Sequence, residues 1–84
     1  MIKKQVTIGK TSRLSAAPAA LLVQTASKYT AGFFVEQQDK QINAKSIMGV
    51  MTLKIVDGEV MTICADGNDE AEAIAEVEKL LTGK

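Results

Sequence analysis

The sequence contains no histidine, no tryptophan and a single cysteine, Cys64, among its 84 residues. Without imidazole there is no Ser-His-Asp triad, no histidine acid or base and no histidine metal ligand. One cysteine excludes an intrachain disulfide and a CxxC pair. The six glycines are scattered and form no phosphate-binding loop pattern. We therefore expect no catalytic residues, no metal and no cofactor, and a protein that is not an enzyme.

Excess charge and long apolar runs are missing as well. Ten basic and ten acidic residues cancel, so the chain lacks the positive surface that neutralises phosphates, and we expect no direct nucleic-acid binding. The longest apolar run, residues 16–23, is too short to span a bilayer. Residues 1–5 lack the apolar segment of a signal peptide. These features predict a cytoplasmic protein without membrane contact, and the length predicts one domain over residues 1–84.

The apolar residues that are present predict seven elements in the order β-α-β-β-α-β-α. Alternation and apolar runs predict strands at 2–8, 33–37, 41–44 and 60–65. Helical spacing predicts helices at 16–28, at 47–53 and from residue 68 or 69 onward. Because each strand keeps a polar side, a mainly antiparallel sheet with helices on one face buries every apolar stripe. The predicted fold class is an open-faced α+β sandwich, with strand 60–65 in a central position.

The last helix has clear signals at its start and along one face. Asn68 or Asp69 can cap it, and the acidic residues that follow suit the positive end of the helix dipole. We expect its buried stripe to be Ala71, Ile74, Val77 and Leu81. Cys64 falls within an apolar run, which predicts an inert buried residue.

In two segments the sequence indicates more than a type of secondary structure. Residues 17–29 read APAALLVQTASKY, and residues 43–53 read NAKSIMGVMTL. The first resembles the first helix of HPr, the histidine-containing phosphocarrier of the bacterial phosphoenolpyruvate-dependent sugar phosphotransferase system. The second resembles the regulatory serine segment of that family. With matching element order, the resemblance extends from about Ile2 to Leu81, and it implies the HPr-like sandwich of a four-stranded antiparallel sheet and three helices.

The carrier loop departs from the family pattern Gly-x-His-Ala-Arg-Pro-Ala. Ser15 stands where the resemblance places the phosphoryl-accepting histidine, and Ala17 stands at the assisting arginine. A serine phosphate is a far more inert ester than a phosphohistidine, and no neighbouring base is visible in the loop. We therefore expect that the chain cannot carry phosphohistidine. Ser15 is interpreted as a helix N-cap, with modification or a residual anion contact as the alternative.

Ser46 carries the regulatory hypothesis. Serine before an apolar helical run is a common N-cap, and the pattern alone favours that role. The resemblance implies that Ser46 is the target of an ATP-dependent HPr kinase/phosphorylase, and that the phosphorylated form is a corepressor for the catabolite control repressor. Backbone amides of the helix could bind the phosphate, and Lys45 and Lys40 lie close in sequence. The two roles are compatible.

The helix that follows Ser46 has more apolar residues than one face can bury: Ile47, Met48, Val50, Met51 and Leu53. The resemblance implies that Ile47, Met48 and Met51 form a docking surface for partners, with the other two facing inward. Methionine suits an adaptable contact surface. The alternative is that all five are core residues.

These observations favour a regulatory HPr-like protein that acts in carbon catabolite repression through phosphorylation of Ser46. It is similar to a family paralogue that also lacks the acceptor histidine but retains the arginine at the position of Ala17. This departure concerns repressor binding and not recognition by the kinase. One alternative is a degenerate phosphotransferase-system component that docks on enzyme I or enzyme II without transferring phosphate. Another is a plain interaction domain, and the oligomeric state is left open.

Overall fold

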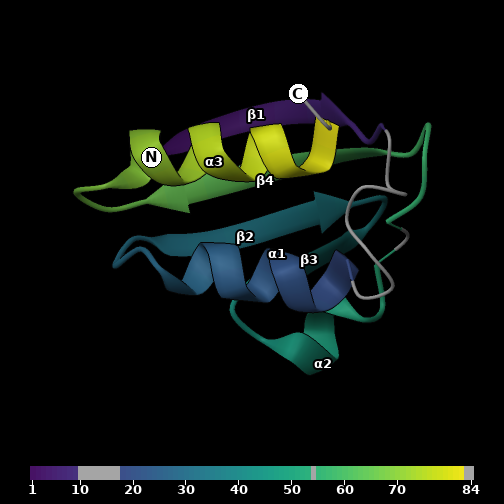
Figure 1. Cartoon of the computed structure of the whole chain (residues 1–84), viewed down its shortest axis with the longest axis horizontal. Helices are drawn as coiled ribbons and strands as arrows, with labels where there is room; N and C mark the ends of the chain where they lie inside the picture. Colours follow the sequence, from purple (N-terminus) through teal and green to yellow (C-terminus); the bar gives the residue numbers. More distant parts are fainter. Residues whose placement is uncertain (10–17, 54, 83–84) are drawn as a thin grey trace.

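The computed structural model describes residues 1–9, 18–53 and 55–82. Its elements follow the predicted order: β1 Ile2–Thr7, α1 Pro18–Ser27, β2 Gly32–Gln37, β3 Lys40–Asn43, α2 Ile47–Val50, β4 Val60–Asp66 and α3 Glu70–Thr82. The four strands form one antiparallel sheet in the order β1-β4-β2-β3. Helices α1 and α3 lie side by side, and α2 lies beyond α1, near β3 (Figure 1). The predicted fold class is confirmed.

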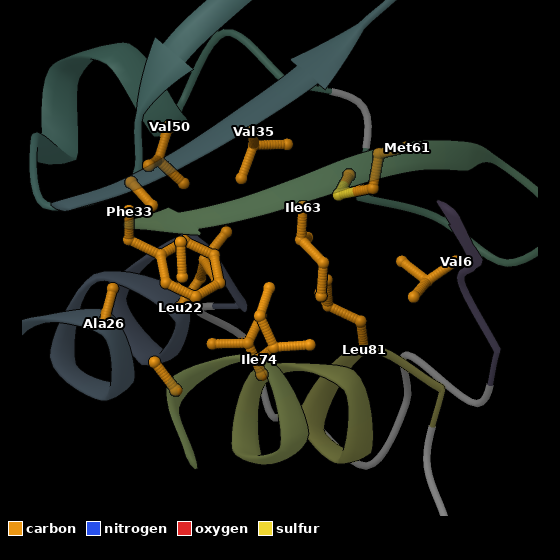
Figure 2. Close-up of a cluster of buried hydrophobic side chains, with 14 of the residues drawn as sticks. Val6, Leu22, Ala26, Phe33, Val35, Val50, Met61, Ile63, Ile74 and Leu81 are labelled. Atoms are coloured by element: carbon orange, nitrogen blue, oxygen red, sulfur yellow. The ribbon is translucent and has the colours of Figure 1, made fainter. Parts of the chain in front are cut away.

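Strand β4 occupies the central position that its apolar run predicted, with β1 on one side and β2 on the other. Facing residues such as Val6 and Met61, or Val35 and Ile63, are paired across these strands. Their side chains meet Leu22 of α1 and the apolar face of α3 between the sheet and the helices (Figure 2). This contact gives each apolar stripe a partner and forms the main core.

The position of Cys64 differs from that of its neighbours in β4. Met61, Ile63 and Ala65 belong to the main core, whereas Cys64 is 2% exposed but is not part of that cluster. Side chains alternate between the faces of a strand, so Cys64 lies on the other face of the sheet. There it stands between its register partners, Lys3 on β1 and Phe34 on β2. Cys64 is buried as predicted, although on the opposite side of the sheet.

The predicted apolar stripe of α3 is wrong at one position. Ala71 is exposed, and Ala73 is buried together with Ile74, Val77 and Leu81. At 100° per residue, Ala73 lies closer than Ala71 to the centre of the face formed by the other three. Spacing from Ile74 alone did not resolve this choice, because both alanines are near neighbours of that face.

The start of α3 agrees with the predicted cap in position, because the Asp69 carbonyl accepts the first helical bond, from the Ala73 N–H at 3.0 Å, but the side chain of Asp69 has other partners. Asp69 immediately precedes the helix, yet its carboxylate accepts hydrogen bonds from the backbone N–H groups of Thr30 and Ala31. Glu70 reaches back instead and accepts a bond from the N–H of Gly67 at 3.1 Å. A side chain on Gly67 would not fit, since its Cβ would lie 2.6 Å from the Cα of Ala31. The turn before α3 therefore binds the segment that follows α1.

The predicted N-cap Ser15 and the neighbouring residues 16 and 17 lie outside the described residues. The described part of α1 ends at Ser27, one residue earlier than predicted. Among the described residues, the helices are too short and too polar for any of them to cross a membrane.

Candidate functional site

Ser46 caps α2 as the sequence predicts. Its backbone is extended, with φ −103° and ψ 112°, and its Oγ accepts a hydrogen bond from the Gly49 N–H at 3.4 Å. Its carbonyl accepts a bond from the N–H of Val50 at 2.9 Å, which closes the first helical turn. Ser46 is exposed to solvent. The hydroxyl oxygen is thus held at a defined position on the surface.

Helix α2 is shorter than the predicted range 47–53. It ends at Val50, and the following N–H groups of Thr52 and Leu53 donate to carbonyls three residues earlier, at 3.1 and 3.0 Å. Bonds of this spacing tighten the chain into a 3₁₀-type turn. The hydroxyl of Thr52 adds a 2.7 Å bond to the carbonyl of Gly49. The result is a short helix followed by a 3₁₀-type turn rather than a two-turn helix.

Three apolar side chains of α2 and the turn after it face solvent. Ile47 is 42% exposed, Met48 80% and Met51 69%, and we call these three residues the α2 patch. Val50 and Leu53 are buried. The division into outward and inward residues is therefore the expected one, and the interpretation of all five as core is wrong. Residues three and four apart are neighbours on a helix, so the three side chains form one surface.

Gly49 lets α2 approach β3 closely. A Cβ at this position would lie 2.8 Å from Cγ2 of Ile42, which belongs to β3. The absence of a side chain thus allows the backbone of α2 to lie against the strand. This contact places Ser46 and the α2 patch at the β3 edge of the molecule.

Lys45 points away from its neighbour Ser46. Its ammonium donates a 2.8 Å hydrogen bond to the carbonyl of Tyr29, just beyond the end of α1, and its backbone N–H donates to Oδ1 of Asn43. A cation is favoured near the negative end of a helix. Lys40 lies at the far end of β3, about 10 Å of strand before Asn43. The two lysines are close to Ser46 in sequence, but in this structure Lys45 has another partner.

Polar contacts between α1 and α3 fix the segment to which Lys45 binds. Both carboxylate oxygens of Asp69 accept backbone bonds of 2.9 Å, from Thr30 and Ala31. The bond from the Thr30 N–H is the main cause that holds the pKa of Asp69 below its ordinary value of 3.8. No sequence motif indicated these contacts, which join residues 38 and 39 positions apart.

A second set of contacts lies on the same seam. Lys28 forms a 2.8 Å ion pair with Glu76, and the hydroxyl of Tyr29 donates to the other oxygen of that carboxylate. The bond from Lys28, followed by that from Tyr29, holds the pKa of Glu76 below its ordinary value. The hydrogen bond to Glu76 raises the pKa of Tyr29 to about 12, because the neutral hydroxyl is the donor.

Ser15 and Ala17 lie outside the described residues, so the carrier-loop expectations for these two positions stay predictions. Within the described ranges, the acidic and cysteine side chains form no cluster of three that could hold a metal ion.

Comparison with known proteins identifies the family. Residues 2–83 match the family model described as the PTS HPr component phosphorylation site. The chain is 47% identical over 74 residues to the HPr-like protein Crh of Halalkalibacterium halodurans. The matched region covers 88% of each of the two chains.

Solved structures agree with this assignment. The phosphocarrier protein HPr of Bacillus anthracis superposes with a TM-score of 0.87 at 40% identity, covering 96% of both chains. Crh of Bacillus subtilis, whose structure is a domain-swapped dimer, superposes with a TM-score of 0.72 at 37% identity, covering 96% of this chain and 88% of that one. The chain therefore belongs to the HPr family of the bacterial phosphotransferase system.

Proposed function

We propose that this chain is a regulatory HPr-family protein whose switch is phosphorylation of Ser46 by HPr kinase/phosphorylase. The observation that carries the proposal is the position of Ser46, exposed at the start of α2 and directly beside the α2 patch. In the reaction, Oγ attacks the γ-phosphorus of ATP, loses its proton and releases ADP. The absence of histidine from the whole sequence supports a role other than phosphohistidine transfer.

A phosphate on Ser46 would change the surface more than the core. It would add nearly two negative charges next to three exposed apolar side chains. The Gly49 N–H, which already donates to Oγ, would remain available to the phosphate oxygens. A partner would then recognise an acidic group and an apolar patch together. We propose that this partner is the catabolite control repressor, and that the protein acts in carbon catabolite repression in the cytoplasm.

The first test is incubation of the purified protein with HPr kinase/phosphorylase and ATP, followed by intact mass measurement. We expect one added phosphate, and none on Ser46→Ala. An ordinary HPr that has a serine at the position equivalent to Ser46 of this chain serves as the positive control for the kinase. No added phosphate, under conditions that modify the control, would overturn the proposal.

The α2 patch can be tested separately from the acceptor. Met48→Glu and Met51→Glu place a charge within the patch, and we expect each to raise the KM of the kinase for this protein. Val56→Glu is the matched control, since Val56 is also an exposed apolar residue but is not part of the α2 patch. Equal KM values for all three variants would show that the kinase does not dock on the patch.

The exposure of the patch also supports a second function that needs no phosphate on Ser46. The chain would dock on enzyme I or enzyme II and compete with the true carrier. Restoring the carrier residues in the double variant Ser15→His, Ala17→Arg tests this proposal. Phosphoryl transfer from enzyme I to the double variant would show that the docking surface survives. In a separate assay, failure of the unaltered chain to compete with HPr for enzyme I or enzyme II would reject this second function.

A further inference from the structure

The peptide unit that joins Tyr29 and Thr30 is held by charged groups at both ends. Its carbonyl oxygen accepts a 2.8 Å bond from the Lys45 ammonium, and its N–H donates a 2.9 Å bond to Oδ2 of Asp69. Each charge polarises the peptide in the sense that strengthens the bond at the other end. Lys45 and Asp69 are therefore linked through one peptide dipole.

The same lysine is the residue that precedes Ser46. On the other side, the Lys45 N–H is bound by the side chain of Asn43, and the Ser46 N–H donates to the Asn43 carbonyl at 3.0 Å. The segment 43–46 is thus attached to β3 by local bonds and to β2 by the Ala44 N–H, which donates to the Phe33 carbonyl at 2.8 Å. The Lys45 side chain adds the bond to the segment that follows α1. Ser46 itself is exposed and its bond to Gly49 is long, at 3.4 Å.

We infer that Lys45 is a positioning residue for Ser46: its bond to the peptide that Asp69 holds keeps the Ser46 turn in the conformation that a kinase binds. This inference rests on the proposed phosphorylation of Ser46. Without the bond, the turn samples other conformations, and only a fraction of the molecules is competent to bind. Such a loss raises KM by the reciprocal of that fraction and leaves kcat unchanged.

The decisive variants are Lys45→Met, which keeps most of the aliphatic stem and removes the charge, and Lys45→Arg, which keeps a cationic donor. We expect Lys45→Met to raise KM for phosphorylation roughly three- to tenfold at unchanged kcat. Lys45→Arg should have a KM within about twofold of the wild-type value, because a cationic donor can still reach the Tyr29 carbonyl. Circular dichroism of each variant checks that the fold is retained.

A direct contact between Lys45 and the kinase would also raise KM, so a remote variant is needed. Asp69→Asn leaves Lys45 in place but loosens the peptide to which it is bound. Asp66→Asn is the matched control, since it removes the same charge nearby without touching that peptide. We expect Asp69→Asn to raise KM and Asp66→Asn to leave it unchanged. An increase for Lys45→Met alone would overturn positioning and assign Lys45 to direct kinase contact.

Amide hydrogen exchange supplies a measurement that does not depend on the kinase. In Lys45→Met we expect faster exchange of the Val50 N–H, which is bound to the Ser46 carbonyl, and little change in the amides of α3. Unchanged exchange at Val50 would overturn the inference even if the kinase accepts the protein. A wild-type protein that the kinase ignores would reject the proposed phosphorylation, while the exchange result would still decide whether Lys45 holds the Ser46 turn.

Discussion

Helices α2 and α3 use their apolar side chains in opposite ways. The 13 residues of α3 bury one continuous stripe and leave the acidic and basic side chains at the surface or at its margin. The 4 residues of α2 bury only Val50, while the α2 patch faces solvent. A single exposed apolar residue is ordinary, whereas a group of adjacent ones marks a contact surface. The comparison shows that α3 contributes buried apolar side chains to the core, whereas α2 leaves most of its apolar side chains at the surface.

The largest expected effect is the loss of a core side chain from α3. Leu81→Ala should lower the free energy of unfolding by about 2–5 kcal/mol, because it leaves a cavity in a fully buried position. Ala71→Ser, on the exposed side of the same helix, should change it by less than about 0.5 kcal/mol. Urea unfolding measures both. Similar losses for the two variants would contradict the assigned face of α3.

The next effect compares a glycine before α3 with one inside α2. Gly67→Ala should cost about 1–3 kcal/mol, because its Cβ meets the backbone of Ala31. In Gly49→Ala the new Cβ would lie 2.8 Å from Cγ2 of Ile42, a side-chain methyl group, and at ordinary contact distance from the Ser46 side chain, but would meet no distant backbone. Repacking of that side chain and the better helix propensity of alanine should keep the change within about 1 kcal/mol. Thermal unfolding of both variants tests the order, and a larger loss at Gly49 would reverse it.

Lowering the pH should reduce the stability that the Asp69 carboxylate contributes at the start of α3. Its pKa is lowered in the folded state, so the carboxylate stabilises the fold above its ordinary pKa of 3.8, and this contribution is lost as pH falls through the lowered value. Asp69→Asn should therefore have a lower Tm than the wild type at neutral pH, with the difference shrinking on acidification. Glu70 and Glu76, whose pKa values are also lowered, titrate in both proteins and cancel in this difference. A difference independent of pH would contradict the assignment to charge.

The smallest expected effect is on stability when the α2 patch is made polar. Met48→Gln and Met51→Gln should each change the free energy of unfolding by less than about 0.5 kcal/mol, because neither side chain is buried. Urea unfolding provides the measurement, with Val50→Ala as the buried control on the same helix. A clear loss of stability in either methionine variant would show that the patch packs against the fold.

Much of this molecule follows from local patterns. Alternation located the four strands within one or two residues, and the apolar run at 60–65 identified the central strand. The serine pattern predicted the start of α2, and the excess of apolar residues after it predicted that some of them would be exposed, whereas the resemblance to the family indicated which ones. These features depend on residues a few positions apart, which is the range over which periodicity and capping act.

The errors and omissions have a common cause. The choice between Ala71 and Ala73 depended on how α3 is rotated against the sheet, and the carboxylate of Asp69 binds the segment after α1 rather than its own helix. The face on which Cys64 lies depended on the strand register. In each case a distant part of the chain decided between local arrangements of similar energy.

The sequence by itself determined the order of the elements and the serine that caps α2, since each is a property of residue type and short spacing. Only the tertiary structure decided that Lys45 binds the carbonyl of Tyr29, and that the Tyr29 hydroxyl binds Glu76. These partners are 16 and 47 residues apart. Hydrogen bonds require contact within about 3 Å, and over such separations only the packing of α1 against its neighbours brings donor and acceptor together.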